Sequence, residues 1–285
     1  MKPEYKPFVD ELIELCIKED IGDGDHTSLS CIPAGEHGRM RLLCKQEGTI
    51  AGIEIAQLVL QRLDPEMKFE QILSDGDRVK PGDVAFYVSG SLRSLLQAER
   101  ILLNIMQRMS GVATQTAVYV KQLEGLHTRV LDTRKTTPGM RVFEKAAVEI
   151  GGGSNHRYNL STAVMLKDNH IDAAGGVARA IEMARAHASF TMTVEIECEN
   201  LDMVREAVDA GADIIMFDNM THDDMAAAIG LIAGRAKTEC SGNVDASNIR
   251  ALADLGVDFI SSGALTHSAP ILDLSLKHLR LLDGK

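Results

Sequence analysis

The sequence lacks the cysteine pattern of a disulfide-bonded or zinc-binding protein. Its five cysteines are spread over 285 residues, are odd in number and include no C-x-x-C pair. This spacing argues against a disulfide framework and against a zinc site. Reduced thiols are typical of proteins in a reducing compartment, so the sequence predicts a cytoplasmic location.

Long apolar runs and blocks of basic residues are also missing. No run of eighteen apolar residues is present and the N-terminus has no apolar signal core, so neither a transmembrane helix nor a signal peptide is expected. The formal net charge is -11. Without a segregated basic patch, such a chain is not expected to bind nucleic acid or a membrane. A small anionic substrate stays compatible, because a few basic residues can converge in a cleft.

The apolar periodicity divides the chain into two unlike parts. Residues 1–116 mix helices with short strands and predict an N-terminal α/β domain. Residues 117–270 repeat strand, polar loop and helix, which predicts a parallel sheet with helices outside it. Residues 271–285 predict a further helix, which packs back on the first domain.

The second part contains six predicted strands, too few for a closed eight-stranded barrel. We therefore expect an incomplete or open α/β barrel. The predicted strands are Thr128–Leu131, Ala163–Leu166, Thr191–Glu197, Asp213–Phe217, Ala236–Glu239 and Phe259–Ser261. The predicted helices between them include Gly176–His187, Leu201–Ala210, Thr221–Ile232 and Ala246–Leu255.

Two features of the first part have more than one interpretation. The run D-G-D-R-V-K-P-G-D at 75–83 occurs in biotinyl and lipoyl carrier domains, but turns in a small β-sandwich are the favoured interpretation. The helical pattern at Leu92–Met109 is apolar around most of its girth and predicts a largely buried helix. Arg100 shares a face with Leu96 and Leu103, so it is expected either to form an ion pair or to face an anionic site.

Polar residues follow each of the six predicted strands. The carboxyl ends of strands in α/β folds converge on one mouth, so these endings predict a single ligand site. They are D-T-R-K-T-T-P-G (132–139), K-D-N-H (167–170), E-I-E-C-E-N (195–200), D-N (218–219), S-G-N (241–243) and S-G (262–263).

The charges at these strand ends have both signs. Strand alternation places Glu195 and Glu197 on one face, where two inward carboxylates require cations or a metal nearby. A structural ion-pair network is the alternative interpretation. Arginine forks such as those of Arg134 and Arg157 suit carboxylates and phosphates. A substrate with several negative groups, with Mg²⁺ on the acidic side, would satisfy both sets of charges.

Glycine-rich segments add a possible phosphate site. The run G-G-G-S-N-H-R at 151–157 matches no nucleotide-binding loop, and by itself it is typical of a loop that ends a helix. The runs at 241–243 and 262–263 each lie between a strand and a helix, where backbone N–H groups suit a phosphate. His267 follows one turn later and could add a contact, although a lone histidine is more often structural.

Three long runs carry a resemblance to a known family. D-T-R-K-T-T-P-G at 132–139, G-G-G-S-N-H-R at 151–157 and L-K-D-N-H at 166–170 resemble the signature of the quinolinate phosphoribosyltransferases, also called nicotinate-nucleotide pyrophosphorylases (carboxylating). The resemblance extends to D-I-G at 20–22, E-R at 99–100, V-E-I-E at 194–197 and G-A-L-T-H at 263–267.

The resemblance implies a fold and a reaction. The fold would be an N-terminal α/β sandwich and an incomplete α/β barrel, in a homodimer. The reaction would join quinolinate to phosphoribosyl pyrophosphate (PRPP) with Mg²⁺ as cofactor, giving nicotinate mononucleotide, pyrophosphate and carbon dioxide for NAD synthesis.

The resemblance also implies residue roles. The quinolinate carboxylates would be held by Arg134, His156, Arg157 and Lys167, with Arg100 reaching the pocket from the partner subunit. Lys135 would contact the pyrophosphate, and Glu197 and Asp218 would face the ribose and the metal. The 5′-phosphate would be held by Ser241, Gly242, Asn243, Ser262 and Gly263, and Thr133 and His267 would complete the substrate-binding residues. Many relatives have a second glycine where this chain has Asn243.

Three other functions stay open at this point. A paralogue of the same fold could act on another substrate, such as nicotinate, and would then have fewer cations for a second carboxylate. A Schiff-base aldolase could use Lys167 as its nucleophile. A catalytically silent scaffold would not require so many converging charges.

Overall fold

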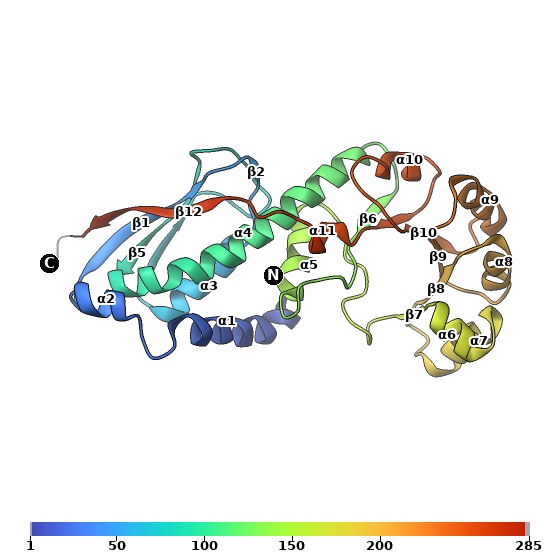
Figure 1. The fold of residues 1–285 in the computed structure, drawn as a ribbon, viewed down its shortest axis with the longest axis horizontal. Helices are drawn as coiled ribbons and strands as arrows, with labels where there is room; N and C mark the ends of the chain where they lie inside the picture. The colour runs from blue at the N-terminus through green and yellow to red at the C-terminus, as the bar shows by residue number, and fades with distance from the viewer. Residues whose placement is uncertain (1, 283–285) are drawn as a thin grey trace. The chain divides into compact units, whose positions relative to one another are not determined.

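The computed structural model describes residues 2–282, which form two compact units (Figure 1). The first unit comprises the described residues within Met1–Ala117, Thr136–Gly152 and Ser268–Lys285. The second comprises Val118–Lys135 and Gly153–His267. No helix among the described residues is long and apolar enough to cross a membrane.

The first unit is built around a four-stranded antiparallel sheet. Its strand order is β12 (Leu274–Leu281), β1 (His37–Cys44), β5 (Val84–Ser91) and β3 (Lys68–Gln71). Burial alternates along β1, where Met40, Leu42 and Cys44 point to one apolar face. A separate antiparallel pair is formed by β2 (Gly48–Thr49) and β4 (Arg78–Val79).

Five α-helices and a short 3₁₀ turn accompany this sheet. They are η1 (Pro3–Tyr5), α1 (Lys6–Ile21), α2 (His26–Cys31), α3 (Ile53–Leu63), α4 (Leu92–Gln122) and α5 (Arg141–Ile150). The longest is α4, whose Leu95, Leu102, Met106 and Met109 are fully buried at helical spacing. Gly111 within α4 lets the backbone at Pro270 pack directly against the helix, because a Cβ on Gly111 would lie 1.9 Å from the Pro270 carbonyl oxygen.

The second unit is an open, six-stranded parallel sheet. Its order is β6 (Arg129–Leu131), β11 (Phe259–Ser261), β10 (Lys237–Ser241), β9 (Ile214–Asp218), β8 (Val194–Cys198) and β7 (Val164–Leu166). The outermost strands, β6 and β7, are not paired with each other, so the sheet does not close. The helices are α6 (Asp168–Ala174), α7 (Val177–His187), α8 (Leu201–Asp209), α9 (His222–Ile232), α10 (Ile249–Ala253) and α11 (Ala264–His267). In Figure 1, α7, α8 and α9 lie outside the strands that they connect.

The sequence predicted this fold class and all six parallel strands, and both predictions are confirmed. The predicted C-terminal helix is wrong. Residues 274–281 form β12, which pairs antiparallel with β1, while residues 283–285 lie outside the described residues. The described part of the tail is grouped with the first unit. Tertiary pairing decides its conformation, because its leucines fit both a helical and an alternating pattern.

Two further expectations for the first unit need correction. Residues Thr136–Gly152 belong to this unit rather than to the barrel, because α5 packs on α4. There Arg108 pairs with the buried Glu144, and a Cβ on Gly151 would lie 2.5 Å from the Ala113 carbonyl oxygen. Arg100 is exposed on α4, so its charge does not lie inside an apolar stripe as the spacing suggested.

Candidate active site

A cavity of about 850 Å³ opens at the carboxyl ends of the parallel strands of the second unit. It is lined by fourteen of the predicted site residues: Thr133, Arg134, Lys135, His156, Arg157, Lys167, Glu197, Asp218, Ser241, Gly242, Asn243, Ser262, Gly263 and His267. Arg100, in the first unit, does not line it. The strand endings therefore meet at one place, as the α/β pattern predicted.

Lys167 and Glu197 form an ion pair across neighbouring strands. Lys167 follows β7 directly, and its Nζ pairs with Oε1 of Glu197 on β8. The backbone N–H of Lys167 donates to Nδ1 of His170 at 3.0 Å, which fixes the chain at the start of α6. The lysine side chain is 40% exposed, so its ammonium can also reach a ligand in the cavity.

Arg134 and Arg157 place two guanidinium groups in the same wall of the cavity. Both side chains are half-buried, and Arg157 donates from Nη1 to the Ala163 carbonyl at 3.3 Å. Burial lowers the pKa of Arg157, and the neighbouring charge of Arg134 lowers it further. Two like charges held together out of water favour an anion between them.

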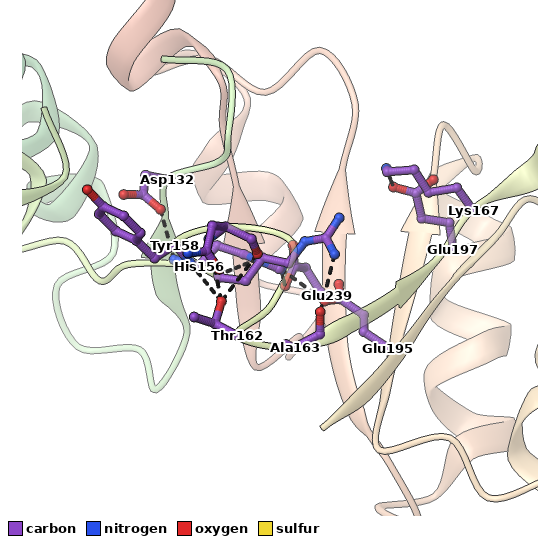
Figure 2. A network of polar contacts seen from close by, with 11 residues as sticks. Asp132, His156, Tyr158, Thr162, Ala163, Lys167, Glu195, Glu197 and Glu239 are labelled. Carbon is purple, nitrogen blue, oxygen red and sulfur yellow. Dashed lines mark hydrogen bonds and ion pairs between the residues drawn. The ribbon is translucent and has the colours of Figure 1, made fainter. Parts of the chain in front are cut away.

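The backbone N–H and both ring nitrogens of His156 have partners among nearby residues. Its backbone N–H donates to Asp132 at 2.8 Å, and its Nδ1 accepts from the backbone N–H of Arg157 at 2.6 Å. In a neutral ring the proton therefore lies on Nε2, which is 3.0 Å from Glu195 Oε2 and 3.6 Å from Glu239 Oε2. Figure 2 shows the ring beside these two carboxylates, away from the Lys167–Glu197 pair. Since both ring nitrogens have partners, His156 orients its neighbours rather than offering a free donor to a ligand.

Glu239 is a residue of the cavity that the sequence analysis missed. Its side chain on β10 is fully buried, and neither carboxylate oxygen has a hydrogen-bond partner. Burial raises its pKa to about 8, with the charge of Glu195 acting in the same direction and His156 and Ser261 opposing it. The signal that could have found it is a carboxylate at the end of the predicted strand Ala236–Glu239, next to the polar residues 241–243.

Two glycines of the cavity allow neighbouring side chains to come close to the backbone. Gly242 has φ +101°, and a Cβ there would lie 2.4 Å from Asn219 Oδ1. A Cβ on Gly263 would lie 2.8 Å from Lys135 Cδ and 3.0 Å from His267 Cδ2. The donors of Ser262 are already used, since its hydroxyl bonds to the Val244 carbonyl and its N–H to the Leu131 carbonyl.

The acidic side of the site extends into a second cavity of about 300 Å³. Glu197 and Asp218 line both cavities. The smaller cavity is lined by six carboxylates and no basic residue: Asp168, Asp172, Glu197, Glu199, Glu206 and Asp218. A separate cluster of His156, Glu195 and Glu239 has ligand-type atoms within 4.8 Å of one another, but it includes neither Glu197 nor Asp218.

Comparisons with known proteins agree with this architecture. The family model for the N-terminal domain of quinolinate phosphoribosyl transferase matches residues 25–110, and the model for its C-terminal domain matches residues 112–277. A probable nicotinate-nucleotide pyrophosphorylase [carboxylating] from a Synechocystis strain is 42% identical over 276 residues, 96% of this chain and 93% of that protein. A probable enzyme of the same name from Bacillus subtilis is 41% identical over 259 residues, 90% of this chain and 89% of that protein.

A solved structure extends the agreement to the whole fold. The crystal structure of NadC from Streptococcus pyogenes superposes with a TM-score of 0.94 at 45% sequence identity, covering 99% of both chains. Both domains match in sequence and the complete fold matches in space, so the resemblance seen in the sequence is confirmed: this chain belongs to the quinolinate phosphoribosyltransferase family.

Proposed function

We propose that this chain is a decarboxylating quinolinate phosphoribosyltransferase, which converts quinolinate and PRPP to nicotinate mononucleotide, pyrophosphate and carbon dioxide in NAD synthesis. The observation that carries the proposal is the single cavity that joins a cationic wall, two carboxylates and two glycines with close neighbours. These three parts suit a dicarboxylate, a ribose and phosphates, and family membership supports the same reaction.

The cationic wall is the binding site that we assign to quinolinate. Arg134 and Arg157 suit planar carboxylates because a guanidinium can bind both carboxylate oxygens, and Lys167 supplies a third positive charge. His156 contributes by holding the backbone of Arg157. Nicotinate has one carboxylate, so it would leave part of this wall without a partner and would bind more weakly.

The glycine side of the cavity is the binding site that we assign to the phosphates of PRPP. Lys135 and His267 flank Gly263, and the missing side chain lets both of these groups come close to the backbone, where they would contact a phosphate. The remaining lining residues of this side are Thr133, Ser241, Gly242, Asn243 and Ser262. Asn243 adopts φ 49°, a conformation that asparagine tolerates better than most residues.

The acidic side fits Mg²⁺. Glu197 and Asp218 border a cavity whose charged lining residues are all carboxylates. Hard divalent cations prefer such oxygen ligands. Mg²⁺ commonly uses one or two carboxylates together with substrate phosphates, so two residues suffice here. When bound, the ion would offset the charge of the leaving pyrophosphate.

The chemistry follows from positioning and charge. The pyridine nitrogen of quinolinate forms a bond to ribose C1 as the bond from C1 to pyrophosphate breaks. Positive charge grows on the ribose, where Glu197 and Asp218 would stabilise it. The ring nitrogen is then cationic, so the neighbouring carbon can lose carbon dioxide, keep the electron pair and take up a proton. Arg134, Arg157 and Lys167 would hold both carboxylates in place through these steps.

We further propose that the active form is a homodimer in which Arg100 of one subunit reaches the quinolinate site of the other. The support is that Arg100 is exposed and belongs to the first unit, outside the residues that line the cavity of its own chain. An exposed arginine on a buried helix is available to a second copy of the chain.

The decisive experiment is a Mg²⁺-dependent assay with PRPP, in which quinolinate and nicotinate are compared in parallel. We expect carbon dioxide release and mononucleotide formation with quinolinate, little product with nicotinate, and no turnover after chelation of the metal. Product with nicotinate alone would move the chain to a paralogous activity. Borohydride trapping of a carbonyl substrate on Lys167 would instead support an aldolase, although the Glu197 ion pair uses the ammonium form rather than the free amine that an aldolase requires.

A further inference from the structure

Glu239, which lines the cavity, forms with Glu195 a buried carboxylate pair that the reaction described above does not use. Glu195 on β8 is 2% exposed and Glu239 on β10 is fully buried, and the two residues lie beside the single imidazole of His156 (Figure 2). Both oxygens of Glu239 and Oε1 of Glu195 have no hydrogen-bond partner. Such unsatisfied buried oxygens are costly if both groups are charged.

The surroundings place a ring N–H close to only one of these two carboxylates. The charged or titratable groups that face Glu239 are Glu195 and Glu197 from β8 and His156 from the loop before β7, with the Ser261 hydroxyl from β11. His156 is the only basic group among them, and its Nε2 lies closer to Glu195, at 3.0 Å, than to Glu239, at 3.6 Å. Two like charges in one dry site cannot both ionise readily, so a proton is expected on one of them.

Glu239 is the member of the pair that holds this proton. Glu195 accepts from Nε2 of His156, which stabilises its charged form, whereas neither oxygen of Glu239 accepts a well-formed hydrogen bond. Burial, followed by the charge of Glu195, raises the pKa of Glu239 to about 8. At neutral pH the residue is therefore mainly a neutral acid.

We propose that Glu239 is a specificity-determining residue whose neutral form allows the cationic wall to bind a dianionic substrate. The inference rests on the proposed function of the cavity. Glu239 lines the same cavity as Arg134, Arg157 and Lys167, so its ionisation would add a negative charge where two substrate carboxylates must bind. An ionised Glu239 would also attract these cations and so weaken their attraction for the substrate carboxylates.

The sign of the pH dependence follows from linkage. A bound dianion repels the ionised form of Glu239 and so favours the protonated form, which means that affinity falls as pH rises above the pKa of the free enzyme. With a pKa of about 8, roughly one enzyme molecule in eleven would still carry the proton at pH 9. The KM for quinolinate should therefore rise up to roughly tenfold between pH 7 and pH 9.

The test compares wild type with Glu239→Gln, which copies the shape of the neutral acid and cannot ionise. We expect the KM of the variant for quinolinate to lie within about twofold of wild type at pH 7 and to stay flat to pH 9, with kcat less affected. Glu182→Gln on the exposed side of α7 removes one negative charge elsewhere in the same unit and should keep the wild-type rise. An unchanged rise in Glu239→Gln, or a raised KM at pH 7, would overturn the proposal.

A measurement without substrate separates this proposal from the proposed function. The pKa of Glu239 is raised on folding from about 4.5, so wild type loses stability relative to Glu239→Gln as pH increases towards 8, and the difference then levels off. We expect the Tm difference between the two proteins to widen from pH 5 to pH 8. A difference that does not depend on pH would refute a protonated Glu239. Absence of turnover in both proteins at every pH would instead refute the function of the cavity.

Wild-type protein provides a check that does not require the variant to fold. Calorimetric titration with quinolinate at pH 8, in two buffers of different ionisation enthalpy, should show net proton uptake on binding. Proton release, or no exchange, would contradict the proposal.

Discussion

Substitution of Gly263 by alanine would test the phosphate side of the cavity with one methyl group. Gly263 lies between β11 and α11 and does not adopt a left-handed conformation, so alanine fits its backbone. The new Cβ would lie 2.8 Å from Lys135 Cδ and 3.0 Å from His267 Cδ2. Both contacts are with side chains that are exposed in the cavity, and these can turn away.

The expected cost falls on activity rather than on stability. Because two flexible side chains can move, the free energy of unfolding should change by less than about 1 kcal/mol. Movement of Lys135 would weaken a charge-assisted contact with a phosphate, a contact worth about 1.5–3 kcal/mol. Complete loss would reduce kcat/KM for PRPP by roughly 10- to 150-fold, and partial displacement places the expectation near tenfold.

The assay is steady-state turnover with saturating quinolinate and varied PRPP, together with thermal unfolding. Gly230→Ala in α9 is the matched control, since its Cβ would have no heavy atom within 4 Å. It should stabilise the protein by up to about 1 kcal/mol and leave the kinetics unchanged. Gly242→Ala should lower both activity and stability, because φ +101° adds backbone strain. Wild-type kcat/KM for PRPP in Gly263→Ala would refute phosphate binding beside Lys135 and His267.

Three other substitutions test separate parts of the structure. Lys167→Met should lower kcat by at least about a hundredfold with little change in circular dichroism, and near-normal turnover at saturating substrate would remove Lys167 from the site. Glu144→Ala should destabilise the protein by about 3 kcal/mol in urea unfolding, because Glu144 is fully buried and accepts from Arg108 and Thr137; an unchanged midpoint would show that this network contributes nothing. Arg100→Ala should be inactive alone but regain activity in mixed dimers with Lys167→Met, and failure of this complementation would argue against a shared site.

The strands of the second unit could be predicted because each is a short apolar run bounded by polar residues. The site followed from the same pattern, since the residues after Leu131, Leu166 and Phe217 are carried to one edge of the sheet by the parallel topology. Local sequence was sufficient there because strand, turn and polar ending all agreed.

What could not be predicted depends on contacts between distant residues. The tail became a strand because β1 offers it a partner, and Leu274 and Leu276 are buried in alternation rather than at helical spacing. The direction of Arg100 depends on which face of α4 is covered by the rest of the first unit. Glu239 was missed because its importance lies in its burial beside Glu195 and His156, which no spacing along the chain reveals.

The pairing of β12 with β1 has a consequence for synthesis on the ribosome. The strand that covers the edge of β1 is separated from it by more than two hundred residues, so it emerges after the entire parallel sheet. Until then β1 presents an unpaired edge, which is a template for pairing with other chains. The second unit can complete its sheet first, whereas the first unit must wait for the last strand. A nascent chain stalled before residue 274 would thus combine a finished catalytic sheet with an aggregation-prone partner, and chaperone binding during synthesis should concentrate on β1.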